Sequence, residues 1–296
     1  MPQRPRLLIS VVLVALLGLG GWPAWSADFV LLSQNLLRFG QGSKTAQKCQ
    51  ALATKAADVD IIVIQELMTS AYPCASVPAD FTFKSFGPYG TTSYKEYYGF
   101  LWRSTQSGAH PKIEYANYYN FASQSDFMRP PTAMLFKVTR QPSTGGTFLI
   151  WVGNMHSVFG KTITGRRDEA TKAGAFFQIL RTTAVGSDQP PTGGWPTLIA
   201  GDWNLPVTNS AGVVDSGFSW LAGQNAAGLP TNIATSLTRA GGASSPYDHI
   251  LYNTVNGGHG VTISNVQLVP LNQTDWPTWR QTVSDHLGVQ AEVTVQ

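Results

Sequence analysis

The sequence predicts an α/β fold, and three observations support that class. Four short runs rich in β-branched and other apolar residues each lead to a polar residue, a pattern typical of buried strands. Two stretches with apolar residues at helical spacing, 44–59 and 166–185, lie between these runs. The chain therefore contains two strand–helix–strand units, which favour a sheet with parallel strands.

The first element along the chain is a predicted export signal, residues 1–27. Arg4 and Arg6 precede an apolar run, 7–19, and small residues follow it, a pattern typical of a secretory signal peptide. The run is shorter than the ~20 residues of a membrane-spanning helix. We therefore expect cleavage after Ser26 or Ala27, a secreted or periplasmic protein, and one catalytic domain over residues 28–296.

Charge gives no argument for a nucleic-acid partner. The full sequence has 20 Lys and Arg against 17 Asp and Glu, and loss of Arg4 and Arg6 leaves 18 against 17, a net charge of +1. A broad basic surface is therefore not expected from composition. Any argument for a DNA substrate has to come from the residues of a site.

The two cysteines, Cys49 and Cys74, are expected to form a disulfide. An exported chain enters an oxidising compartment, and two distant cysteines with no His or further Cys nearby make a poor metal site. Two buried free thiols are the alternative.

Polar side chains follow all four predicted strands, which are expected at 29–32, 60–65, 148–152 and 197–201. In an α/β sheet, ligands bind at the carboxyl ends of the strands. The residues at these ends are Asn35, Glu66, His156 and Asp202, the last followed by Asn204.

Two later strands carry their polar residues at the beginning instead. Asp248 precedes the run 249–252, and Asp285 and His286 precede the run 287–295. If these strands run antiparallel to the earlier ones, all six polar positions meet at one edge. Residues 209–245 show the weakest periodicity and are expected to be an irregular connection.

This set of residues favours metal-assisted hydrolysis of a phosphate ester. Carboxylates suit a hard cation such as Mg²⁺, with Ca²⁺ or Mn²⁺ as alternatives. Two imidazoles beside the ion can transfer protons near neutral pH. Zinc peptidase chemistry fits poorly because the sequence has no His-Glu-x-x-His helix.

Three segments in this order resemble the endonuclease/exonuclease/phosphatase superfamily, and within it secreted deoxyribonuclease I: Gln65-Glu66, Gly201-Asp202-Trp203-Asn204 and Ser284-Asp285-His286. The resemblance extends from Leu32 to Val293. It implies a four-layer α/β/β/α sandwich, in which two packed mixed sheets are covered by helices. Two further segments, 93–103 and 126–131, favour the deoxyribonuclease branch.

The resemblance implies two His–carboxylate pairs. Glu96 would orient His156, and Asp248 would orient His286, because a carboxylate fixes the imidazole tautomer and favours its charged form. We expect His286 to act as general base on the attacking water and His156 as general acid toward the leaving oxygen. The reverse assignment remains open.

The resemblance also implies the remaining site residues. Glu66 would be the main metal ligand, and Asp285 would share that ion or bind a second one. Arg129 would neutralise a non-bridging phosphate oxygen. Tyr94 would contact the DNA minor groove or, equally, be a half-buried sheet aromatic. The residues expected to position phosphate, water or metal are Asp202, Asn35 and Asn204.

One position departs from the deoxyribonuclease I pattern. Met68 stands where that enzyme has an Arg that enters the minor groove, so contact with DNA would differ there. The disulfide positions of that enzyme differ as well.

Three functions compete at this point. The first is a secreted endonuclease that acts on DNA. The second keeps the fold and the metal but acts on a phosphoinositide or sphingomyelin, or serves as the nuclease subunit of a distending-type toxin. The third is a non-catalytic binding module, which the two His–carboxylate pairs argue against because binding alone does not need them.

Overall fold

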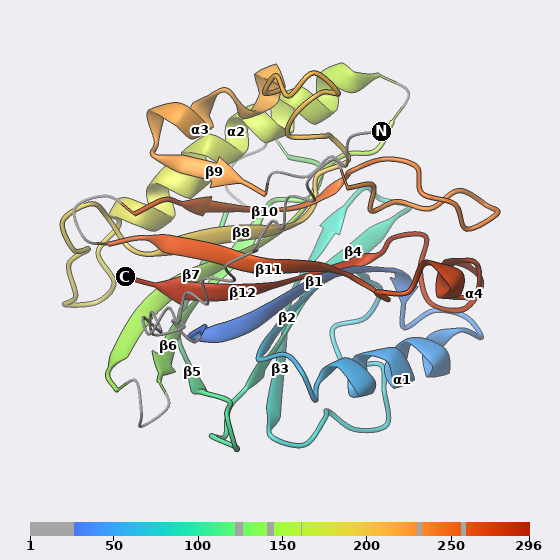
Figure 1. Ribbon diagram of the computed structural model, residues 1–296, viewed down its shortest axis with the longest axis horizontal. Coiled ribbons are helices and arrows are strands. Elements are labelled where there is room, and N and C mark those ends of the chain that lie inside the picture. Colours follow the sequence, from blue (N-terminus) through green and yellow to red (C-terminus); the bar gives the residue numbers. More distant parts are fainter. Residues whose placement is uncertain (1–26, 122–126, 141–144, 161, 230–232, 256–258) are drawn as a thin grey trace, which may run out of the picture.

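The computed structural model describes residues 27–121, 127–140, 145–160, 162–229, 233–255 and 259–296. The predicted export signal lies outside them except for Ala27. The described chain forms two six-stranded mixed sheets packed face to face, with helices on the two outer faces (Figure 1). The four-layer α/β/β/α sandwich implied by the resemblance is therefore confirmed.

The strands of each sheet come from both halves of the chain. The first sheet contains, in spatial order, β11 (Val261–Val269), β12 (Gly288–Val295), β1 (Phe29–Phe39), β2 (Ile61–Leu67), β4 (Lys95–Arg103) and β3 (Phe81–Gly90). The second contains β5 (Lys112–Asn120), β6 (Thr132–Thr139), β7 (Thr147–His156), β8 (Thr197–Asp202), β10 (Asp248–Asn253) and β9 (Ala226–Gly228).

Helices cover each sheet from outside. Helices α1 (Thr45–Lys55) and α4 (Trp276–Thr282) pack on the first sheet through Leu52 and Trp279. Helices α2 (Ile163–Thr182) and α3 (Trp220–Gly223) pack on the second through Phe176 and Leu221. Two short 3₁₀ helices, η1 (Ser216–Phe218) and η2 (Gln273–Asp275), lie in the connections.

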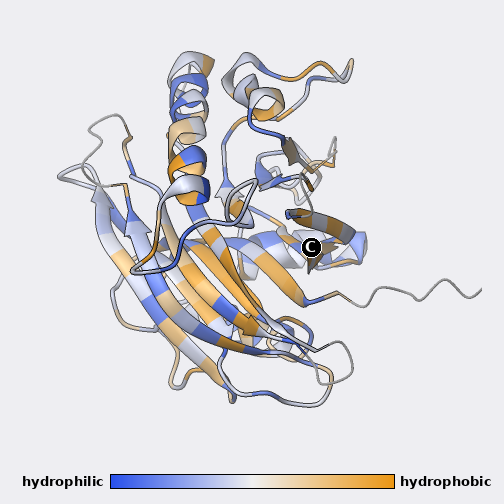
Figure 2. Cartoon of the chain, turned by 90° about the vertical axis from the view of Figure 1, so that its left-hand side faces the viewer, coloured by the Kyte–Doolittle hydropathy of each residue, from blue (hydrophilic) through white to orange (hydrophobic). Residues whose placement is uncertain are grey.

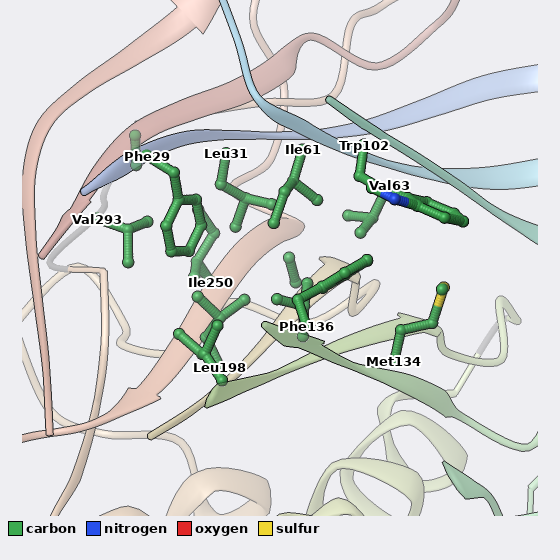
Figure 3. Close-up of a cluster of buried hydrophobic side chains, with 14 of the residues drawn as sticks. Phe29, Leu31, Ile61, Val63, Trp102, Met134, Phe136, Leu198, Ile250 and Val293 are labelled. Carbon is green, nitrogen blue, oxygen red and sulfur yellow. The ribbon is translucent and has the colours of Figure 1, made fainter. Parts of the chain in front are cut away.

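The main core lies between the two sheets. Because side chains alternate between the faces of a strand, every second residue points inward, and apolar residues recur along the strands (Figure 2). The outer faces of the sheets are apolar as well, where the helices cover them. Leu31 and Val63 of the first sheet face Phe136 and Leu198 of the second, all fully buried (Figure 3). Burial of each such side chain stabilises the fold by about 1.5–3 kcal/mol.

Strand directions bring the polar strand ends together as predicted. Strands β1 and β2, which flank α1, are parallel, and so are β7 and β8, which flank α2. Strand β10 runs antiparallel to β8, so Asp248 pairs with Asp202 in the register. Strand β12 runs antiparallel to β1. The polar ends of β1, β2, β7 and β8 therefore meet the polar beginnings of β10 and β12.

The first helix is shorter than the sequence indicates. It ends at Lys55 rather than near Val59, because the chain turns there and the carbonyl groups of the turn accept hydrogen bonds from Arg103. The Arg103 guanidinium donates from Nη2 to Ala56 O (2.6 Å) and Val59 O (3.0 Å). Tertiary hydrogen bonds thus override the helical pattern at its carboxyl end.

The weakly periodic stretch 209–245 is mostly irregular, as expected, but it holds η1, α3 and the short strand β9. Strand β9 pairs with β10 at the edge of the second sheet. Its sequence, Ala-Ala-Gly, carries no alternation of apolar and polar residues, so its position in the sheet could not be predicted from the pattern.

The predicted disulfide is confirmed. Cys49 and Cys74 are bonded, with their Cα atoms 5.6 Å apart. The bond ties α1 to the segment that follows β2.

His249 is a buried neutral histidine in β10. Its Nε2 lies 2.7 Å from Pro246 O and 3.2 Å from Leu205 O. Burial lowers the pKa of His249 to about 4. Below the ordinary pKa near 6.5 the unfolded chain takes up a proton that the folded ring refuses, so stability falls as the pH drops from 6.5 toward 4.

We expect acid to destabilise the protein through this residue by roughly 3 kcal/mol, since each pKa unit corresponds to about 1.4 kcal/mol. Urea denaturation at pH 7 and pH 4 measures the loss. His249→Asn serves as the comparison, and its deficit relative to wild type should shrink as the pH falls. An equal deficit at both pH values would contradict a neutral His249.

Candidate active site

The predicted site residues converge on one cleft of about 500 Å³ at the shared edge of the two sheets. Asn35, Glu96 and Asp248 do not line the cleft themselves. They are buried behind it and are hydrogen-bonded to residues that do line it. The predicted residues that line the cleft are Glu66, Tyr94, Arg129, His156, Asp202, Asn204, Asp285 and His286.

The first His–carboxylate pair joins the two sheets. His156 ends β7, and its Nδ1 lies 2.6 Å from Oε1 of the buried Glu96 on β4. Burial opposes a charge on the ring, but the Glu96 carboxylate outweighs it and raises the pKa of His156. Burial likewise opposes ionisation of Glu96, yet His156 and Arg129 prevail and lower the Glu96 pKa.

The second pair also joins the sheets. His286 precedes β12, and its Nδ1 lies 2.7 Å from Oδ2 of Asp248, the first residue of β10. Burial opposes protonation here too, but Asp248 and Asp202 raise the pKa of His286 well above its usual range. Ser284 fixes the backbone: its Oγ donates to Asn35 O (2.6 Å) and accepts from His286 N (3.1 Å).

Asp202 lies between the two imidazoles. Its Oδ2 is 3.5 Å from Nε2 of both His156 and His286 and accepts a hydrogen bond from Asn35 Nδ2 at 3.0 Å. Gly201 precedes it with φ +154°, and a Cβ there would lie 1.9 Å from Met155 O. Only glycine therefore lets β8 approach β7 closely enough at this point.

Glu66 is held in a strained conformation. Its φ of 57° lies in the left-handed region, which is uncommon for a non-glycine residue, and residues in such strained conformations cluster at functional sites. Oε1 accepts from Asn35 Nδ2 (3.1 Å), and Oε2 accepts from Arg38 N (3.1 Å) and Tyr94 OH (3.0 Å). Three donors thus orient the carboxylate.

Tyr94 therefore helps to orient the Glu66 carboxylate. Burial and the Glu66 carboxylate raise the pKa of Tyr94, so its hydroxyl remains a donor. The Arg38 guanidinium lies 5.8 Å from the centre of the ring. Its predicted contact with DNA stays a prediction.

Asp202, Asp248 and His286 could hold a divalent metal ion, because their ligand atoms all lie within 4.8 Å of one another. Only Asp202 is shared with the predicted ligand set. The other predicted ligands, Glu66 and Asp285, line the same cleft, and Asp285 Oδ1 is buried without a hydrogen-bond partner among the described residues. A buried carboxylate oxygen without a donor fits a cation.

Arg129 is fixed beside His156 by backbone carbonyls. Its Nε donates to His156 O at 2.9 Å, and its Nη2 donates to Ser157 O. Asn204, with φ 50°, donates from Nδ2 to the same Ser157 O (3.0 Å), and its own N–H binds Asp202 Oδ1 (2.9 Å). A guanidinium and an amide thus lie together at the end of the cleft that holds His156.

Two buried side chains that support this end are missing from the sequence prediction. Glu169 on α2 accepts from Met128 N (2.7 Å), Ser157 Oγ (2.8 Å) and Val158 N (2.6 Å). Asn154 on β7 donates to Ile64 O and Gly99 O of the other sheet. A carboxylate at a core-facing helical position, and an amide in an apolar strand, were the available signals.

Lys48 on α1 is a third missed residue. It is only 2% exposed, and its Nζ donates to Leu37 O. Burial lowers the pKa of Lys48 to about 8, although the Glu66 and Asp285 carboxylates act against this. The ammonium supports the backbone turn that presents Arg38 N to Glu66. Its signal in the sequence was a lysine at an apolar helical position.

In the described part of the chain, no helix is both long enough and apolar enough to cross a membrane.

No protein-family model matches the sequence, and no curated protein matches it. Solved structures do match. Humanized D. rerio TDP2 superposes with a TM-score of 0.56 at 13% identity, over 90% of this chain and 100% of that one. An endonuclease/exonuclease/phosphatase family protein from Bacteroides thetaiotaomicron gives 0.52 at 16% identity, over 89% and 96%.

ANGEL2, described as a 2′,3′-cyclic phosphatase, gives a TM-score of 0.53 at 13% identity, over 90% of this chain and 94% of that one. At such low identities the likeness concerns the fold. The particular resemblance to deoxyribonuclease I stays a prediction. The chain therefore has the endonuclease/exonuclease/phosphatase fold, over nine-tenths of its length.

Proposed function

We propose that the protein is a divalent-metal-dependent phosphodiesterase and that its substrate is DNA, which it cuts as an endonuclease. The observation that carries the proposal is the pair of carboxylate-bound imidazoles, His156 and His286, whose Nε2 atoms both lie 3.5 Å from Asp202. Two proton-transfer groups that face each other across one carboxylate suit in-line displacement at phosphorus. Export to the periplasm or the medium is supported by the amino-terminal pattern and the disulfide.

In this mechanism His286 removes the proton from the attacking water and His156 protonates the leaving oxygen. Because Nδ1 of each ring binds a carboxylate, Nε2 is the atom that exchanges the proton. The Glu96 carboxylate raises the pKa of His156, which favours the protonated form that a general acid needs. His286 has to release its proton before it can act as a base.

Arg129 and Asn204 would stabilise the charge that develops on the phosphate oxygens. Both are already held by Ser157 O, so they need little reorganisation during the reaction. Loss of one such donor typically raises the barrier by about 3 kcal/mol. Glu66 and Asp285, with Asp202, would hold Mg²⁺, and the bound ion would supply positive charge to the transition state.

Hydrolysis assays on the purified mature chain, residues 28–296, test the proposal. Supercoiled plasmid, inositol phosphates and sphingomyelin vesicles are each incubated with Mg²⁺, Ca²⁺, Mn²⁺ or EDTA. We expect nicked plasmid with a divalent cation, none with EDTA, and none from Asp202→Asn.

Other outcomes assign the alternatives. Hydrolysis of only sphingomyelin would move the substrate to a phospholipid, and hydrolysis of only the inositol phosphate would move it to a phosphomonoester. Either result would overturn DNA as the substrate. No hydrolysis of any substrate with any cation would favour a binding module and overturn the proposal.

A further inference from the structure

Phe159 is an exposed aromatic ring beside the catalytic residues. It lies three residues after His156, lines the same cleft, and is 72% exposed. Single exposed apolar side chains are common on protein surfaces, so the exposure of Phe159 matters here because the ring lines the cleft of the candidate site. Its place at the rim makes a bound substrate the available partner.

The backbone that carries Phe159 is firmly anchored although the ring is exposed. Ser157 Oγ and Val158 N donate to Glu169, which is 5% exposed, at 2.8 and 2.6 Å. Ser157 O accepts from Arg129 and Asn204. The two residues before Phe159 are therefore bonded to the same network as the groups that would hold the phosphate, which places the backbone of Phe159 next to them.

The rest of the cleft suits a hydrophilic substrate with planar groups. Tyr94, with the Arg38 guanidinium 5.8 Å from its ring centre, and Tyr247 add two further aromatic rings to the walls. Most of the other lining residues are polar or charged, among them Ser236, Ser244 and Ser245. Aromatic faces beside a phosphate-binding group are typical of nucleotide recognition, because every base has a π face.

We propose that Phe159 is a specificity-determining residue that stacks on the nucleobase next to the scissile phosphate, so that the cleft selects nucleotide phosphodiesters. This inference rests on the proposed function and specifies its substrate class. An acyl chain would instead need a continuous wall of aliphatic side chains, and Leu37 and Leu237 are the aliphatic residues that line this cleft.

Two small phosphodiesters that release p-nitrophenolate test this inference: thymidine 5′-(p-nitrophenyl phosphate), which has a base, and methyl p-nitrophenyl phosphate, which has none. We expect wild type to prefer the thymidine ester. Phe159→Ala should lower kcat/KM for that ester by roughly tenfold, the size of one base–aromatic stack, and leave the methyl ester unchanged. Phe159→Trp should restore the preference.

Leu271→Ala is the matched control, because Leu271 is 70% exposed and lines a different groove, between α1 and α4. It should change neither rate, and neither variant should shift the thermal unfolding midpoint. A wild type that hydrolyses the methyl ester but gains nothing from the base overturns the inference and leaves the proposed function intact.

Further results would also decide against the stacking role. If Phe159→Ala lowered kcat/KM equally for both esters, Phe159 would support the catalytic groups rather than bind the base. If Phe159→Ala lost binding to sphingomyelin vesicles but hydrolysed the thymidine ester as wild type does, the ring would contact a lipid rather than a base. A wild type that nicks plasmid but hydrolyses neither ester overturns the inference and leaves the proposed function intact, whereas a wild type that hydrolyses neither plasmid nor ester overturns both.

Discussion

His286→Ala and His156→Ala are each expected to lower phosphodiester hydrolysis by about 10³-fold, within the range for a lost general acid or base. The reason is geometric, since each Nε2 faces the cleft while Nδ1 is bound to its carboxylate. The double variant should be little worse than either single one, because groups that act in one step are not additive. Plasmid nicking with Mg²⁺ measures the loss.

Two further variants sharpen this result. Asp248→Asn keeps the side-chain shape but removes the charge that holds His286, so its activity should fall as well. His110→Asn is the control, because His110 binds Asp60 just before β2, at the end of that strand away from the cleft. This variant should stay active. Wild-type turnover by a folded His156→Ala or His286→Ala protein would refute the assigned roles.

Loss of the Cys49–Cys74 disulfide is expected to have the largest effect on stability. The bond closes a loop of 25 residues, for which the chain-entropy relation gives about 3.5 kcal/mol. The Cys49→Ser/Cys74→Ser double variant should therefore unfold at a lower urea concentration than wild type. Urea denaturation followed by far-UV circular dichroism measures the difference.

A reductant provides the control for this experiment. Dithiothreitol should bring wild type to the stability of the double variant and should leave the double variant unchanged. Equal stability of oxidised wild type and the double variant would show that α1 and the segment after β2 are held by packing alone.

Much of the architecture followed from local patterns. The apolar runs and the polar residues after them identified β1, β2, β7 and β8, because a buried strand and the point where it ends both depend on residues that are adjacent in the sequence. Polar residues at the beginnings of β10 and β12 made their antiparallel direction the condition for convergence at one edge, and both strands meet it. The assembly into two separate sheets came only from the resemblance, because the pattern does not say which sheet a strand joins.

The site was predictable to a different extent. His156 and Asp202 stand at strand ends, but nothing local ties Glu96 to a histidine 60 residues away. Glu169 and Lys48 escaped prediction because their roles arise when helices dock and their charged ends reach backbone groups across the fold. A charged residue on a helix is ordinarily solvated, so the buried backbone partners of Glu169 and Lys48 could not be predicted from their positions on the helices.

Both proton-transfer pairs take one member from each sheet: His156 with Glu96, and His286 with Asp248. In the proposed mechanism, turnover therefore requires both sheets in their docked position, and neither sheet alone can support it. A core substitution that shifts one sheet against the other can therefore abolish hydrolysis although every site residue and all secondary structure are retained.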